Sequence, residues 1–118
     1  MNWLHLVGYF FGGAFLSNAI PHFVSGTMGR PFQSPFANPR GEGLSSSTVN
    51  IVWGFANLVF AYVLLVGRGS FDLHVPGDAA AAGLGLLAMG LIAARLFGRF
   101  HGGNSPTAPT SITATKGS

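Results

Sequence analysis

The sequence contains no cysteine and very few charged residues. Without cysteine there is no disulfide framework, no thiolate metal site and no thiol nucleophile. Asp, Glu, Lys and Arg make up 8% of the 118 residues, whereas a typical soluble domain has about 25%. This shortage of charge excludes most soluble folds, and the 48% of hydrophobic residues excludes a solvated, disordered chain. The class that remains is an integral membrane protein.

Sequence motifs of known catalytic sites are missing as well. There is no nucleophile elbow, zinc-peptidase motif, CxxC pair or phosphate-binding loop. The only carboxylates are Glu42, Asp72 and Asp78. The four histidines are expected to lie two on each side of the membrane, so no more than two can meet. We therefore assign no catalytic residue, no metal and no cofactor. The scattered Lys and Arg residues indicate contacts with lipid headgroups and not a nucleic-acid site.

Three long apolar segments predict three transmembrane helices, at about residues 3–24, 47–66 and 78–98. About 20 residues, each rising ~1.5 Å, cross the hydrocarbon layer. Segment 47–66 has no Asp, Glu, Lys, Arg or His. The third segment continues past Arg95 because an arginine near a helix end can extend its side chain to the interface. The sequence therefore predicts an all-α membrane protein.

These segments belong to one predicted transmembrane domain, residues 1–101. Residues 102–118 are rich in Gly, Ser, Thr and Pro and are expected to form a disordered cytoplasmic tail. A cleaved signal peptide is the alternative for the first segment, because Ser17 and Ala19 are small residues at a suitable spacing. Against cleavage, the first five residues contain no Lys or Arg, and the apolar stretch is longer than that of a usual signal peptide.

The connector between the first two segments, residues 25–46, is long and rich in Pro, Phe and Gly. Its prolines recur every four residues in PFQSPFANP, which prevents a continuous helix. Its phenylalanines predict that it lies against the membrane surface or folds back over the helix ends. A re-entrant segment and a polyproline ligand are the alternatives. The Ser/Thr run at 45–48 is expected to cap the second helix, and Asp78 is expected to cap the third.

The distribution of positive charge predicts the orientation. With three spans, the long connector and the C-terminal tail lie on the same side of the membrane. The cations on that side are Arg30, Arg40, Arg95, Arg99 and Lys116. Only Arg68 lies on the other side. The positive-inside rule then places the N-terminus outside and the C-terminus in the cytoplasm.

Small residues predict where the helices pack, because they let two backbones approach closely in a membrane. The first helix has Gly8 and Gly12 on one face. The second helix has a single stripe of small and polar residues at i, i+4, i+7 and i+11, namely Asn50, Gly54, Asn57 and Ala61. We expect these faces of the first and second helices to pack together.

The predicted topology also brings polar residues from separate segments to the cytoplasmic end. The expected binding cluster consists of Asn18, His22, Asn50 and Arg95, with Glu42 from the connector in a position to join it. Each residue has an ordinary structural alternative. His22 can serve as a helix-end residue, the asparagines can form hydrogen bonds between helices, and Arg95 can anchor its helix at the interface.

The block from Asn18 to Asn57 resembles the central part of small, uncharacterised, multi-spanning bacterial membrane proteins. The resemblance rests on an NxxPHF end of the first helix, the Gly/Pro/Phe connector and an NxxWGxxN second helix. It covers about a third of the chain. It implies a location in the bacterial inner membrane and no particular activity.

Three function classes follow from these features. The leading expectation is a non-enzymatic membrane protein that acts as a complex subunit or binds a lipid or small amphiphile at its cytoplasmic face. The second is an oligomeric transporter or proton-coupled channel, with Asn57 in mid-membrane and His22 at its mouth. The third is a lipid-modifying enzyme with His22 as the base. Since three helices bury little surface, we expect a homo-oligomer or a larger membrane-protein partner in addition to the bilayer.

Overall fold

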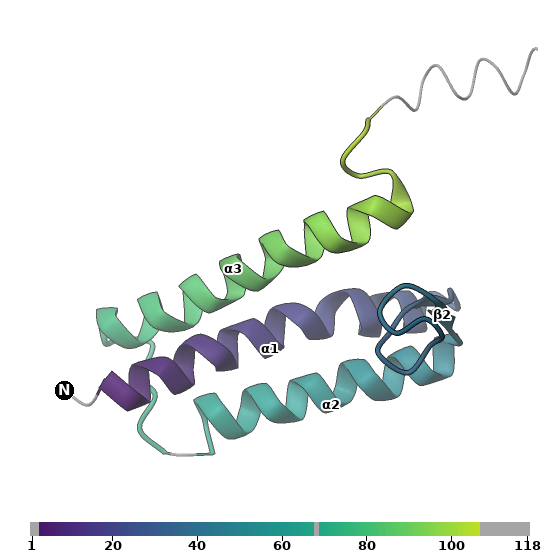
Figure 1. Ribbon diagram of the computed structural model, residues 1–118. Helices are drawn as coiled ribbons and strands as arrows, with labels where there is room; N and C mark the ends of the chain where they lie inside the picture. The colour runs from purple at the N-terminus through teal and green to yellow at the C-terminus, as the bar shows by residue number, and fades with distance from the viewer. Residues whose placement is uncertain (1–2, 68, 107–118) are drawn as a thin grey trace, which may run out of the picture.

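The computed structural model describes residues 3–67 and 69–106. Over these residues the chain forms three helices and one small hairpin (Figure 1). The helices are α1 (Trp3–Thr27), α2 (Ser47–Leu65) and α3 (Pro76–His101). The strands are β1 (Phe32–Gln33) and β2 (Leu44–Ser45), which pair antiparallel with Phe32 opposite Ser45. The prediction of a mainly helical fold is confirmed.

Helix α1 lies between α2 and α3, as Figure 1 shows. It packs along both neighbours, whereas α2 and α3 have almost no direct contact with each other. The approach to α3 is very close: a Cβ atom added at Gly13 would overlap the carbonyl of Ala82, and one added at Gly85 would overlap the carbonyl of Phe10. Glycine at positions 13 and 85 is therefore what allows the backbones of α1 and α3 to touch.

The α1–α2 interface contains the stripe of small and polar residues. The buried residues of α2 are Asn50, Gly54, Asn57 and Ala61. A Cβ atom at Gly54 would lie 2.7 Å from the backbone nitrogen of Phe23, so α1 and α2 also meet backbone to backbone. Gly12 lies against Leu65, but Gly8 does not make the expected close approach, since no atom lies within 4 Å of its Cβ position.

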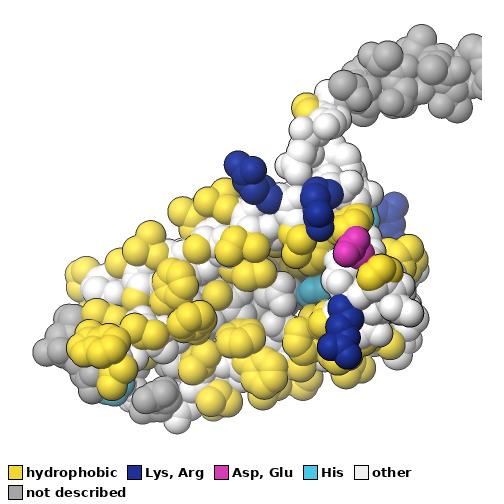
Figure 2. All heavy atoms as spheres, viewed as in Figure 1, with side chains coloured by type: hydrophobic (Ala, Val, Ile, Leu, Met, Phe, Trp, Pro, Cys, Tyr) yellow, Lys and Arg dark blue, Asp and Glu magenta, His cyan; other side chains and the backbone are white. Residues whose placement is uncertain are grey.

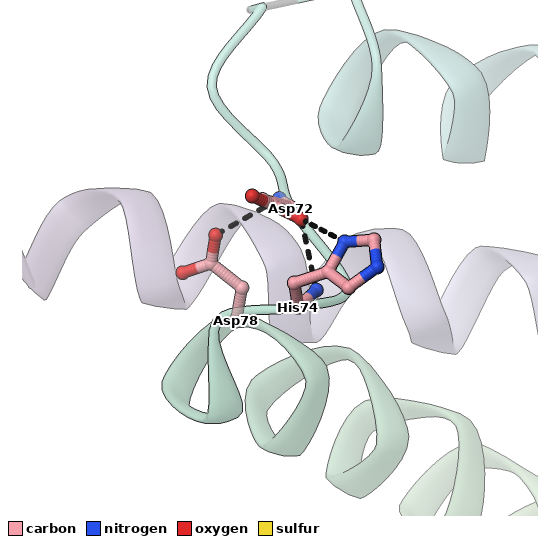
Figure 3. Close-up of polar contacts among 3 residues, drawn as sticks. All are labelled: Asp72, His74 and Asp78. Carbon is pink, nitrogen blue, oxygen red and sulfur yellow. Dashed lines mark hydrogen bonds and ion pairs between the residues drawn. The ribbon is translucent and has the colours of Figure 1, made fainter.

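The helix starts differ in how they are capped. Ser46 caps α2, and its hydroxyl accepts a hydrogen bond from the backbone nitrogen of Val49. The expectation that Asp78 caps α3 is wrong: α3 begins at Pro76, after Val75, and Asp78 lies in its first turn. There Asp78 is buried and accepts a hydrogen bond from the backbone nitrogen of Asp72, which ties the α2–α3 connector to α3 (Figure 3).

The long connector folds back over the ends of the helices, one of the two arrangements expected for it. Phe32 is buried against the rings of His22 and Phe97, at centroid distances of 5.5 Å and 4.7 Å. His101, the last residue of α3, stacks on Phe32 and forms a 2.9 Å hydrogen bond with Gln33. The connector and the C-terminal end of α3, both predicted to lie on the cytoplasmic side, are thus in contact at one end of the molecule.

Apolar side chains cover the outside of the helices. On the face shown in Figure 2 they extend along the length of the molecule, and charged side chains gather at the end that carries the connector. Large hydrophobic residues that are more than half exposed include Phe11, Val52, Phe55, Leu84, Leu87 and Leu91. Water-soluble proteins rarely expose so much contiguous apolar surface.

Two of the helices, α2 and α3, are long and apolar enough to cross a membrane. Within their most apolar stretches only 22% and 6% of the residues are buried, which is unlike the core helix of a soluble protein. Helix α1 has 25 residues and no Asp, Glu, Lys or Arg, yet it is less apolar. Its buried residues include Gly12, Gly13, Ser17 and His22, so the residues that lower its hydropathy are among those facing its two neighbours.

The first five residues of the predicted tail lie within the described part of the chain. Residues 102–106 form turns after α3, and the side-chain amide of Asn104 donates to the carbonyl of Arg95. Gly102 has a φ of 76°, the left-handed conformation that commonly ends a helix. The rest of the predicted tail, residues 107–118, lies outside the described residues.

Candidate functional site

The most buried polar contact at the connector end joins α1 to α2. His22 is 2% exposed and Asn50 is fully buried. The Nδ1 atom of His22 lies 2.7 Å from the Oδ1 atom of Asn50. Both residues belong to the predicted binding cluster, and the register of α1 against α2 places them at the same height.

The surroundings of Asn50 determine how the imidazole is protonated. The side-chain nitrogen of Asn50 donates to three backbone carbonyls, those of Phe32, Ser45 and Ser46, at 3.1 to 3.2 Å. Its oxygen therefore faces His22 as an acceptor, so Nδ1 of His22 carries a proton. In the neutral ring, Nε2 is then the acceptor nitrogen, and it has no hydrogen-bond partner among residues 3–67 and 69–106.

A second amide contact lies about two turns further along α2. The side-chain nitrogen of Asn18 donates to the Oδ1 atom of Asn57 at 3.0 Å, and Asn57 in turn donates to the carbonyl of Trp53 at 2.8 Å. Asn57 is fully buried within the chain. Its carboxamide is therefore used for packing α1 against α2.

A pocket of about 330 Å³ opens beside these contacts. All three helices and the connector contribute to its walls, and we call it the connector pocket. Its lining includes Asn18 and His22 from α1, Trp53 from α2, Phe97 from α3, and Ser34 and Arg40 from the connector. Figure 2 shows a histidine side chain recessed in a hollow at this end of the molecule, with basic and acidic side chains around it.

Besides Nε2 of His22, two polar groups of the connector pocket have no partner among the described residues. Arg40 is exposed, and the one ion pair in the described part of the chain joins His74 to Asp72, far from it at the opposite end of the helices (Figure 3). The indole Nε1 of Trp53 is buried and makes no hydrogen bond. An unsatisfied buried donor costs about 1–3 kcal/mol, so an acceptor that reached this N–H would be favoured.

A second, apolar hollow of about 520 Å³ shares Trp53 with the connector pocket. We call it the α2 groove. It is lined by Phe36, Thr48, Val49, Val52, Trp53 and Ala56. Phe36 packs edge-on against the Trp53 ring, with the ring centroids 5.1 Å apart, and so lies where the polar pocket and the apolar groove meet.

Two members of the predicted cluster do not join it. The Arg95 and Glu42 side chains are exposed, and neither lines the connector pocket. Arg95 contributes only its backbone carbonyl, to Asn104, within the described residues. The cation at the pocket is instead Arg40, whose position depends on how the connector folds.

The pocket lacks the groups that common catalytic mechanisms need. Ser34 lines it, but the hydroxyl of Ser34 is bonded to the hydroxyl of Ser45 at 2.6 Å and not to His22, so no nucleophile–base pair is formed. No carboxylate is among its lining residues. Across residues 3–67 and 69–106, no group of three His, Asp or Glu side chains is placed to hold a metal ion.

Sequence reasoning missed Trp53, Arg40, Ser34 and Phe97 as pocket residues. For Trp53 a signal was present, because it is three positions after Asn50 and four before Asn57 and so lies next to the polar stripe of α2. Phe97 follows the third segment's apolar pattern and looks like an ordinary packing residue.

Comparison with known proteins gives no match to a family model, a curated protein or a solved structure.

Proposed function

We propose that this protein is an integral membrane protein of three spans that binds the polar group of a small amphiphile in the connector pocket. The observation that carries the proposal is the pocket itself. It is built from α1, α2, α3 and the connector, and it combines Arg40, His22 and the unpartnered indole of Trp53 with apolar walls. A few placed polar groups in a mainly apolar concavity are typical of small-molecule sites.

The packing of the helices supports the proposal that all three are inserted in the membrane. If α2 and α3 cross the bilayer, α1 crosses with them, because it lies between them and touches both along its length. Its polar residues then face protein and avoid lipid. The excess of arginine at the connector end supports a cytoplasmic location for that end, by the positive-inside rule.

A pore built around Asn57 has less support. Asn57 has both ends of its carboxamide engaged inside one chain, so it is not available to line a channel between copies. An enzyme with His22 as the base lacks a neighbouring nucleophile. Binding needs neither feature, and for that reason we favour it. Assembly with further copies or with a larger membrane protein is compatible with binding and is a separate prediction.

The experiment compares amphiphiles that remain bound to the purified wild-type protein and to two histidine variants. We expect mass spectrometry of the intact protein to show a bound amphiphile in the wild type. His22→Gln should reduce this occupancy because the glutamine replaces the fixed imidazole in the pocket wall. His74→Gln is the matched control, since His74 is almost fully exposed at the opposite end.

Folding is monitored by circular dichroism and thermal melting of the same samples. Equal occupancy in the wild type and in folded His22→Gln would contradict a site at His22. A wild-type protein that binds no amphiphile from a total lipid extract would contradict the proposed function itself.

A further inference from the structure

Resting on this proposed function, we infer that the amphiphile is a single-chain carboxylate of the fatty-acid type. Its carboxylate occupies the connector pocket beside Arg40 and its acyl chain lies along the α2 groove. The inference comes from the charge of the pocket, the hydrogen-bonding groups on its walls and the shape of the space next to it.

The charge of the connector pocket selects an anion. Among the described residues, Arg40 is the only Lys, Arg, Asp or Glu that lines the pocket. The guanidinium of Arg40 has no carboxylate partner in the described part of the chain. A guanidinium binds a carboxylate through two parallel hydrogen bonds, and one cation matches one negative charge.

The hydrogen-bonding groups fit a carboxyl group as well. The N–H of Trp53 is a donor without a partner, and it suits a carboxylate oxygen. The imidazole of His22 is held in one orientation through Nδ1 by Asn50, and its Nε2 donates to a carboxylate only when the ring is protonated, so we assign Arg40 and Trp53 as the donors. A carboxylate has two acceptor oxygens, enough for Arg40 and Trp53 together. A neutral glycerol ester would leave the charge of Arg40 unpaired.

The α2 groove accepts the acyl chain. Its lining is apolar except for Thr48, and Val49, Val52 and Phe36 in its wall are exposed. It adjoins the connector pocket at Trp53, so one molecule can place its head in the pocket and its chain in the groove.

A single chain fits this arrangement better than two. A second apolar hollow, of about 400 Å³, lies between α1 and α3 and is lined in part by Phe32 and Phe97. The rings of His22, Phe32 and Phe97 contact one another at centroid distances of 4.7 to 5.8 Å and form a wall on that side of the connector pocket. We therefore assign the chain to the α2 groove, which shares Trp53 with the connector pocket.

The test uses brominated acyl chains, which quench tryptophan fluorescence on contact. The chain has two tryptophans, so Trp3→Phe leaves Trp53 as the only tryptophan. The probes, added to the full-length Trp3→Phe protein in detergent, are dibromostearate, the neutral dibromostearoyl monoglyceride and a brominated phosphatidylglycerol. We expect saturable quenching by dibromostearate at the lowest concentration. In the same background, Arg40→Gln should raise the half-saturation concentration about tenfold or more, whereas Arg99→Gln, an exposed cation on α3, should not change it.

The outcomes distinguish a wrong ligand class from a wrong proposed function. If the monoglyceride quenches Trp53 as well as the carboxylate does, or if Arg40→Gln and Arg99→Gln weaken quenching equally, the anionic ligand is excluded and the amphiphile site is retained. Preferential quenching by phosphatidylglycerol would overturn the single-chain assignment. No saturable quenching by any probe would overturn the proposed function as well. The comparison of ligands needs no pocket variant, so it decides even if Arg40→Gln fails to fold.

Discussion

The imidazole of His22 and the carboxamide of Asn50 are 2.7 Å apart, although 28 positions separate the two residues in the sequence. The contact joins the C-terminal half of α1 to the first turn of α2. Through its nitrogen, Asn50 also holds the connector at Phe32 and Ser45. One buried amide thus positions two helices and the segment that completes the connector pocket.

Removing this amide should destabilise the connector end. Asn50→Ala removes the side-chain hydrogen bonds to two connector carbonyls and to His22, and a buried polar group left unsatisfied costs about 1–3 kcal/mol. We expect a clearly lower melting temperature in detergent for Asn50→Ala. Asn104→Ala is the control, because Asn104 is exposed and makes one hydrogen bond, to Arg95. Similar melting temperatures for the two variants would show that Asn50 does not hold the structure together.

Alanine substitutions at two glycines of α3 should change the stability of the protein in opposite directions. A Cβ atom at Gly85 would overlap the carbonyl of Phe10, so Gly85→Ala must separate α1 from α3, at a cost of about 1–3 kcal/mol. Gly83 has no atom within 4 Å of its Cβ position, so Gly83→Ala should stabilise the helix by about 0.5–1 kcal/mol. Thermal melting of both variants checks this pair. A stabilising effect of Gly85→Ala would mean that α3 is not packed on α1 in this register.

The topology can be checked with single cysteines, since the sequence has none of its own. Met28 and Leu73 are exposed at opposite ends of the helices, and Ser105 is exposed just after α3. Met28→Cys and Ser105→Cys should react with an impermeant maleimide only from the cytoplasmic side, and Leu73→Cys only from outside. Labelling of Met28→Cys and Leu73→Cys from the same side would contradict three spans.

The α2–α3 connector should be held in its conformation by Asp78 more than by His74. Asp78 accepts a hydrogen bond from the backbone of Asp72 and is buried, whereas the His74–Asp72 pair is solvent-exposed (Figure 3). Exposed ion pairs contribute little. Hydrogen–deuterium exchange at residues 71–75 should therefore rise in Asp78→Ala and stay near the wild-type rate in His74→Ala. Faster exchange in His74→Ala than in Asp78→Ala would contradict this order.

The features that could be read from the sequence are those governed by the helical repeat. Asn50, Gly54, Asn57 and Ala61 recur at helical spacing, and they are the buried residues of α2. The Ser46 cap follows from local chemistry in the same way. Local patterns of this kind depend on neighbours within a few residues, which the sequence displays directly.

The features that could not be read depend on contacts between distant segments. Nothing near Arg40 in the sequence shows that the connector brings it to the pocket while Glu42, two residues on, stays outside. In the same way, nothing near His101 in the sequence indicates that it forms a hydrogen bond with Gln33 of β1. The sequence pattern predicts Gly8 and not Gly13 as a packing residue, because it does not show that α1 has neighbours on both sides.

The central position of α1 has a consequence for the order in which the chain is assembled. The hydrogen bonds of Asn18 and His22 are made with α2, and those of Asn50 with α1, the connector and its own helix start. None of them requires α3, which attaches to α1 through glycine contacts. During synthesis, the first two helices can therefore satisfy their polar groups as a hairpin while the ribosome is still translating the third. The third helix then docks on α1, and its arrival closes the connector pocket with Phe97.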